Sequence, residues 1–66
     1  MTPANTITVK ILDKEYQVAC PQEQEAELAV SAKYLDKQMR GIRDSGKVIG
    51  LERIAVMAAL NISYEL

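Results

Sequence analysis

The stretch Leu51–Leu66 constrains the fold most, because it has the composition of a helix and is apolar on every side. It is rich in Ala, Leu and Met and contains neither Gly nor Pro, so helix is its preferred state. Between Ile54 and Leu60 every side chain is nonpolar, and a helix that is apolar all round must be buried in protein or in a membrane. At about 1.5 Å per residue the stretch spans roughly 24 Å, which is short of a bilayer. We therefore expect another protein surface to cover this helix.

The length of the chain also indicates that it needs support from another protein surface. A core built from 66 residues is marginally stable, and small domains of this size usually rely on an additional support. One cysteine, Cys20, and no histidine leave neither an internal disulfide nor a common zinc site. Oligomerisation is the support that remains, and a single cysteine behind a polar, uncharged start is typical of a cytoplasmic protein.

Two short stretches alternate between apolar and polar residues and predict a β-hairpin. Residues 6–12 form the first strand, 13–15 the turn and 16–20 the second strand, after a disordered leader at residues 1–5. A two-stranded hairpin is marginal in water, so it must pack on a helix or on another chain. The predicted inner faces are Ile7, Val9 and Ile11 on the first strand, and Tyr16, Val18 and Cys20 on the second.

A helix is predicted next, with Pro21 at its first position, where the missing N–H costs nothing. Asp36 and Arg40 are spaced for an ion pair on its solvent side. Residues 44–46 supply a turn, and Gly50 or its neighbour caps the last helix. The apolar residues recur in steps of four and three, as on a core-facing helix: Leu28, Ala32, Leu35, Met39 and Ile42.

The predicted fold class is therefore α+β, a small ββαα head. We expect a ββα head at residues 6–50 and the start of a long dimerising helix at residues 51–66. The last helix lacks a C-terminal signal, so we expect it to be cut off, or disordered, beyond Leu66.

One stretch has the spacing of a phosphate-binding loop, Gly41–Val48, with four residues between two glycines and a lysine after the second. Val48 stands where a hydroxyl must bind magnesium, and Asp44 would place a carboxylate inside a phosphate cradle. The stretch also follows a predicted helix rather than a strand. We predict no nucleotide, metal or other cofactor.

Catalysis has little support. Without histidine, a nucleophile such as Cys20 lacks its usual base, and no pair of carboxylates is fixed around a pocket. The sequence therefore predicts that the chain is not an enzyme and takes no small-molecule substrate.

A basic cluster of Arg40, Arg43 and Lys47 has three interpretations. It can compensate the dipole at a helix C-terminus, dock an acidic protein, or make the chain a small dimeric nucleic-acid-binding module. The net charge of −1 and the lack of interleaved aromatic residues favour a protein partner over nucleic acid.

The residues also resemble a known family. The run from Glu52 to Leu66 looks like the start of the long helix of ZapA, a bacterial cell-division family, and its most specific part is residues 59–66. Residues 7–12, the pair Cys20-Pro21 and residues 42–44 resemble the N-terminal head of the same family.

The resemblance implies a non-enzymatic cytoplasmic protein that acts at the division site, at mid-cell. ZapA proteins bind filaments of FtsZ, a tubulin-like GTPase with an expected acidic surface, and promote their bundling and Z-ring assembly. They form dimers, and tetramers through a C-terminal coiled coil, so the part that makes tetramers would follow Leu66. No nucleic acid and no membrane is implied.

Two sets of residues follow from the resemblance. The FtsZ-binding positions are Lys14, Arg43, Lys47 and Glu52; two of them are lysines where relatives can carry arginine, so a bidentate contact would become a point charge. The expected dimer seam is Leu51, Ile54, Ala55, Met57, Ala58, Asn61, Ile62 and Glu65.

Overall fold

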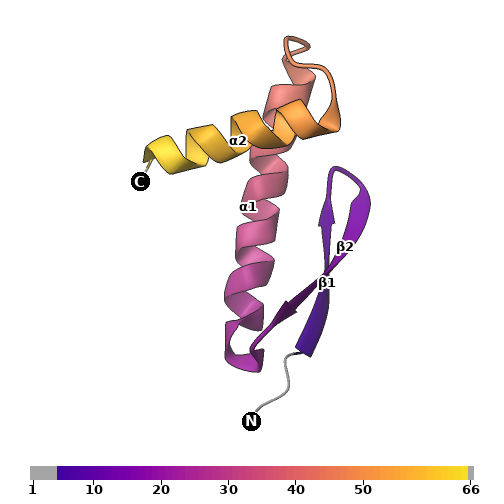
Figure 1. Cartoon of the computed structure of the whole chain (residues 1–66), viewed down its shortest axis with the longest axis vertical. Coiled ribbons are helices and arrows are strands. Elements are labelled where there is room, and N and C mark those ends of the chain that lie inside the picture. The colour runs from indigo at the N-terminus through magenta and orange to yellow at the C-terminus, as the bar shows by residue number, and fades with distance from the viewer. Residues whose placement is uncertain (1–4, 66) are drawn as a thin grey trace. The chain divides into compact units, whose positions relative to one another are not determined.

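The computed structural model describes the backbone of residues 5–65 and the side chains of residues 5–64. The elements follow in the order β1 (Asn5–Ile11), β2 (Lys14–Cys20), the short 3-10 helix η1 (Gln22–Gln24), α1 (Glu25–Asp44) and α2 (Leu51–Glu65) (Figure 1). The predicted α+β class with a ββαα order is confirmed. The described chain forms two compact units that divide within α1, after Asp36. Apart from Asn5, the predicted leader lies outside the described residues.

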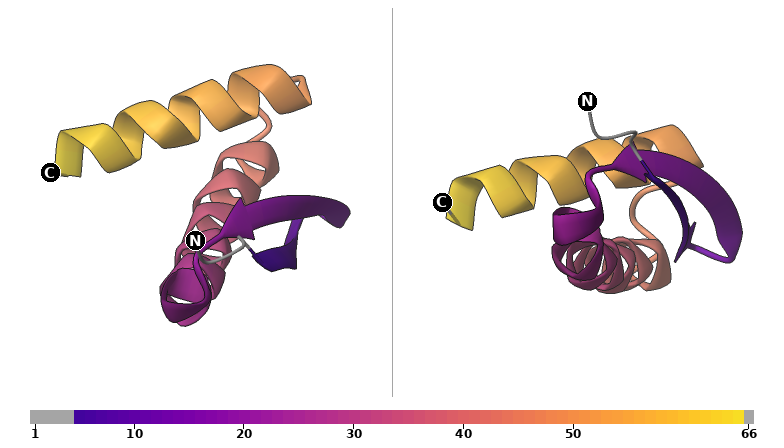
Figure 2. Two further views of the ribbon diagram at one scale, coloured as in Figure 1. Left: turned by 60° about the horizontal axis from the view of Figure 1, so that its bottom comes forward. Right: turned by 90° about the horizontal axis from the view of Figure 1, so that it is seen from below.

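The hairpin belongs to the first unit and lies beside the N-terminal part of α1 (Figure 2). Its strands are antiparallel, and the register places Val9 opposite Tyr16 and Ile7 opposite Val18. Because side chains alternate along a strand, both predicted apolar faces lie on the same side of the hairpin. Val9 and Cys20 are the buried residues of this face.

The hairpin turn is shorter than predicted. Ile11 pairs with Lys14, so the loop is Leu12-Asp13 alone, and Lys14 and Glu15 belong to β2. The prediction of a 13–15 turn, with Leu12 in the strand, was wrong. Both loop residues have positive φ, 49° and 66°, as type I′ turns require. Asn-Gly is the usual sequence for such a turn, and an apolar residue at its first position gave no signal.

A distant side chain supports this turn. The backbone N–H of Leu12 donates a 2.7 Å hydrogen bond to Oδ1 of Asp36, on α1. The sequence placed Asp36 on the solvent side of its helix, whereas in the structure it is partly buried. A left-handed conformation costs a non-glycine residue about 1–2 kcal/mol, and the bond from Asp36 offsets part of that cost.

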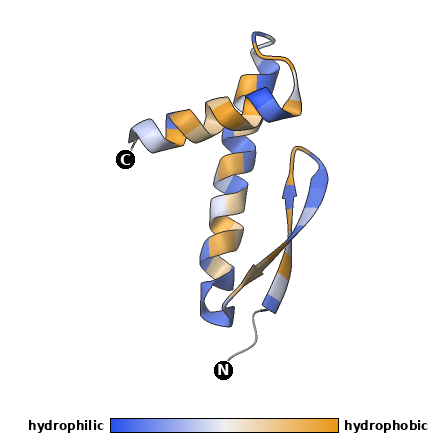
Figure 3. Cartoon of the chain, in the orientation of Figure 1, coloured by the Kyte–Doolittle hydropathy of each residue, from blue (hydrophilic) through white to orange (hydrophobic). Residues whose placement is uncertain are grey.

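The start of α1 also differs from the prediction. Pro21 has extended backbone angles, φ −61° and ψ 146°, so it caps η1 and does not occupy the first helical position. Its carbonyl accepts a 2.9 Å hydrogen bond from the N–H of Gln24, and α1 begins one residue later. The apolar stripe is confirmed: Met39 is buried, and the other four members are half-buried. Figure 3 shows the resulting alternation of hydrophobic and hydrophilic residues along α1.

A serine hydroxyl organises the end of α1. Ser45 Oγ donates to the carbonyl of Ile42 at 2.7 Å and accepts from the N–H of Lys47 at 3.3 Å. In a Schellman motif the N–H of Lys47 would donate directly to the carbonyl of Ile42, and here the hydroxyl stands between the two groups. Gly46, with φ 72°, turns the chain and donates to the carbonyl of Arg43 at 3.1 Å. The turn predicted at residues 44–46 is confirmed at Ser45 and Gly46, whereas Asp44 is the last residue of α1.

The last helix begins as predicted, because the carbonyl of Gly50 accepts the first α2 hydrogen bond, from Ile54 N–H at 3.0 Å. Gly50 has a φ of 104°, a conformation that L side chains rarely adopt. One face of α2 is buried within the chain, at Ile54 (5% exposed) and Ala58 (0%). Within residues 5–65 no helix is long and apolar enough to cross a membrane.

Candidate partner-binding surfaces

An open groove lies where the connector between the helices meets the first turns of α2. Its volume is about 680 Å³, and it lies wholly within the second unit. We call it the connector groove, and its lining residues are Lys47, Val48, Ile49, Glu52, Arg53, Val56 and Met57. Two of the residues predicted to bind FtsZ, Lys47 and Glu52, therefore line the same groove.

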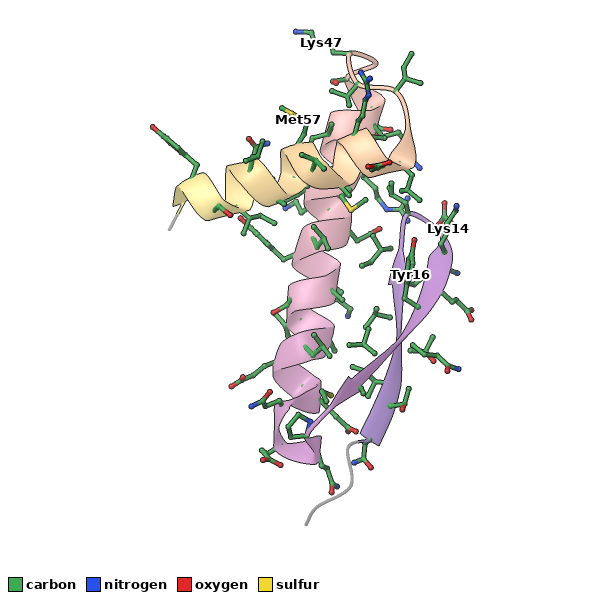
Figure 4. The ribbon with its side chains drawn as sticks, in the orientation of Figure 1. Lys14, Tyr16, Lys47 and Met57 are labelled. Atoms are coloured by element: carbon green, nitrogen blue, oxygen red, sulfur yellow. The ribbon has the colours of Figure 1, made fainter. Side chains whose placement is uncertain are left out.

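Helix geometry explains this lining. The groove residues of α2 form two neighbouring pairs, 52–53 and 56–57, that are four positions apart. This spacing places all four on one face of the helix. The side chains at 54 and 58 point to a different face, which is buried within the chain. The connector completes the groove, and its backbone is set by the Ser45 bridge at one end and by Gly50 at the other. Figure 4 shows Lys47 projecting from the connector and Met57 from α2.

The charged side chains of the groove are available to a partner. Lys47, Glu52 and Arg53 are exposed, and within the described residues they form no ion pair. Arg43 lies nearby in sequence, and its Nε is 3.3 Å from Asp44 Oδ1, with both side chains largely exposed. Exposed ion pairs contribute about 0–1 kcal/mol, so a partner carboxylate can replace Asp44 at little cost.

The other two basic residues singled out from the sequence have different surroundings. Arg40 is half-buried and already interacts within the chain, so the Arg40/Arg43/Lys47 cluster does not present three equivalent cations. Lys14 belongs to the first unit, where it is exposed at the first position of β2 beside the turn (Figure 4). The four predicted FtsZ-binding residues are thus divided, with Lys14 in one unit and the rest in the other.

The predicted dimer seam is spread over several faces of α2. Ile54 and Ala58 are buried in the single chain, while Leu51, Ala55 and Ile62 are half-buried. Met57 and Asn61 are exposed, and the side chain of Glu65 lies outside the described ones. No contact within one chain tests the seam, which stays a prediction.

Several apolar residues of α2 remain uncovered, and of these only Met57 had been singled out from the sequence. Val56, Leu60 and Tyr64 are each four residues apart and are 53%, 59% and 93% exposed, with Met57 beside them. We call these four residues the α2 stripe. The spacing of four was visible in the sequence, but an almost uniformly apolar helix does not show which of its faces its own chain covers.

A metal site needs several ligating side chains close together. The described residues contain no group of three His, Cys, Asp or Glu side chains placed to hold an ion. Cys20 is a buried free thiol, where it packs as a small apolar residue.

Comparison with known proteins identifies the family. The family model described as "Cell division protein ZapA" matches residues 7–66. The chain belongs to the ZapA family. The resemblance seen in the head and in residues 52–66 is therefore confirmed, and with it membership of a family of cell-division proteins.

Individual ZapA relatives agree with this assignment. Cell division protein ZapA of Pseudomonas aeruginosa (strain PAO1) is 59% identical over 66 residues, which are 100% of this chain and 64% of that protein. The Haemophilus ducreyi ZapA is 36% identical over 63 residues, 96% of this chain and 59% of its own length. The chain thus spans about three fifths of the length of these curated relatives.

A solved structure has the same fold. This protein, described as "Unknown conserved bacterial protein from Pseudomonas aeruginosa PAO1", superimposes with a TM-score of 0.89 at 61% sequence identity. The match covers 92% of this chain and 67% of that one.

Proposed function

We propose that this ZapA-family chain is a non-enzymatic cell-division regulator that binds FtsZ filaments and promotes their bundling and Z-ring assembly. It acts in the cytoplasm at mid-cell, as a dimer or higher oligomer. The observation that carries the proposal is the connector groove, where exposed Lys47, Glu52 and Arg53 gather on a chain of this family. Arg43, and Lys14 in the other unit, contribute further exposed charge.

The two surfaces take different parts in this function. The charged residues contact the filament, and α2 joins two chains. A dimer carries two filament-binding surfaces, so weak individual contacts gain strength through repeated attachment along a polymer. A longer family member would form tetramers through the coiled coil that continues the last helix.

The exposure of α2 supports its part in self-association. The α2 stripe exposes four apolar side chains, and a marginal core of 66 residues gains from covering them. Ile54 and Ala58 hold α2 within its own chain, while Leu60 and Tyr64 of the stripe and the half-buried Leu51, Ala55 and Ile62 supply contacts to the partner chain.

Co-sedimentation with GTP-assembled FtsZ tests the filament contact. We expect the chain to pellet with the polymer, and Arg43→Glu or Lys47→Glu to weaken this binding at least fivefold without changing the oligomeric state. Lys33→Glu is the matched control, because it reverses one exposed charge on α1, in the first unit. Failure of the wild-type chain to pellet would refute the function. If Arg43→Glu and Lys47→Glu bind FtsZ as well as the Lys33→Glu control, Arg43 and Lys47 are solvated charges that do not contact the filament.

Sedimentation velocity tests the dimer. Leu60→Glu places a charge in the middle of the α2 stripe and should shift the chain to monomers at micromolar concentration. Val30→Glu alters another exposed apolar residue, in the first unit, and should leave the dimer intact. A wild-type chain that sediments as a monomer would contradict this part of the proposal.

A further inference from the structure

We propose that the connector groove is an apolar anchor site, which takes apolar side chains from an acidic segment of the filament protein. The inference rests on the proposed function and extends it. A charge patch alone would bind through solvated ion pairs, whereas this groove adds apolar side chains that a partner can cover.

The shape of the groove supports an inserted partner segment. It is open to solvent, and its volume is about 680 Å³, which is of the same order as ligand-binding clefts, about 300–1,000 Å³. Four of its seven lining residues are apolar: Val48, Ile49, Val56 and Met57. An open groove of this kind suits one face of an amphipathic segment, whose side chains reach the apolar lining from a solvated backbone.

Ile49 is the most informative of these residues. It is 84% exposed, although isoleucine is among the residue types most often buried in folded proteins. It lies in a short connector, between a backbone held by Ser45 Oγ and the positive-φ Gly50. A connector whose backbone is already held needs little further ordering when a partner binds, which lowers the cost of burying Ile49.

The charges beside the apolar lining define the chemistry of the partner. Lys47 and Arg53 outnumber Glu52 in the groove, so its local charge is positive although the net charge of the chain is −1. Without ion pairs in the described residues, both cations can receive carboxylates. The occupant is therefore a segment that carries apolar side chains flanked by Asp or Glu. A second copy of the chain would bring the same cations against the groove, whereas Leu60 and Tyr64, the stripe residues outside the groove, carry no charge.

The test compares Ile49→Ala with Val30→Ala by quantitative co-sedimentation with GTP-assembled FtsZ. Both changes shorten an exposed apolar side chain without altering charge, one in the groove and one on α1 in the first unit. We expect Ile49→Ala to weaken binding about tenfold, as for an anchor residue, and Val30→Ala to change it less than twofold. Raising salt from about 0.1 M to about 0.4 M screens exposed charges, so the deficit of Lys47→Gln should shrink while that of Ile49→Ala persists.

The outcomes separate this inference from the function on which it rests. If the wild-type chain pellets with FtsZ and Ile49→Ala binds equally well, the anchor is refuted and the proposed function stands. If the wild-type chain does not pellet at either salt concentration, the proposed function fails, and the partner named here fails with it. If Ile49→Ala lowers the sedimentation coefficient of the chain alone, the groove is occupied by a second copy, which also overturns the inference.

Discussion

Replacing Asp36 by alanine tests the contact that links the hairpin turn to α1. The change removes a 2.7 Å hydrogen bond to a carboxylate and leaves the partly buried N–H of Leu12 without that acceptor. Hydrogen bonds to charged groups contribute about 1.5–3 kcal/mol. Alanine is the better helix former by up to about 0.7 kcal/mol, which offsets part of the loss. The expected net destabilisation is therefore about 1–2.5 kcal/mol.

Urea unfolding followed by far-UV circular dichroism measures this loss, at one fixed protein concentration because self-association adds to apparent stability. For a chain of 66 residues, a loss of about 1.5 kcal/mol corresponds to a fall in Tm of roughly 10 °C. Asp36→Asn keeps an acceptor oxygen and should lose less than Asp36→Ala.

Asp44→Ala is the matched control. Its carboxylate lies 3.3 Å from Arg43 Nε but is largely exposed, so removing it should change the free energy of unfolding by less than about 0.5 kcal/mol. A loss below about 0.5 kcal/mol for Asp36→Ala would refute the reasoning, because the bond to Leu12 would then contribute no more than a surface ion pair.

Three further substitutions test the second unit by the same unfolding measurement. Ser45→Ala removes both hydrogen bonds of the hydroxyl and should lower the free energy of unfolding by about 0.5–1.5 kcal/mol. Ser45→Thr keeps a hydroxyl and should retain most of the stability. If the wild type and both variants are equally stable, the bridge contributes nothing. Gly50→Ala should cost about 1–3 kcal/mol from backbone strain alone, since its φ is 104° and no atom lies within 4 Å of an added Cβ; a neutral result would contradict that conformation. Ala58→Leu overfills a site that is 0% exposed and should cost about 1–3 kcal/mol, whereas a stabilising effect would show that α2 leaves unfilled space there.

The regular elements of the fold were predictable from side-chain periodicity. Alternation in residues 6–12 and 16–20 gave both strands and most of their apolar faces, although Tyr16 is 41% exposed, and steps of three and four gave the stripe on α1. These patterns are local, because each residue's face follows from its neighbours in the same element. These elements could therefore be predicted without knowing which distant residues contact one another.

The turn could not be predicted in the same way. Leu12 continues the apolar pattern of β1, and nothing within a few residues shows that it adopts a φ of 49°. Its hydrogen-bond acceptor, Asp36, is 24 residues away in sequence. The error therefore arose where a tertiary contact overrides local turn preference.

The candidate site was predicted only in part, because two of its three charged residues were singled out from the sequence and Arg53 was not. Lys47 and Glu52 were identified through the family resemblance, and the structure places both in the connector groove. Val48 and Ile49 were regarded only as a connector, because two apolar residues between glycines form no recognisable motif. Exposure decides their role, and exposure depends on which faces of the helices are covered.

The bond between Leu12 and Asp36 has a consequence for synthesis on the ribosome. The hairpin residues leave the exit tunnel first, but the acceptor that supports their turn follows 24 residues later. Chains are made at about 5–20 residues per second, whereas an isolated hairpin forms within about 1–10 μs. For a second or more the nascent hairpin must therefore do without the carboxylate that holds its loop. The loop of this hairpin therefore gains its support from Asp36 only after the first part of α1 has been translated.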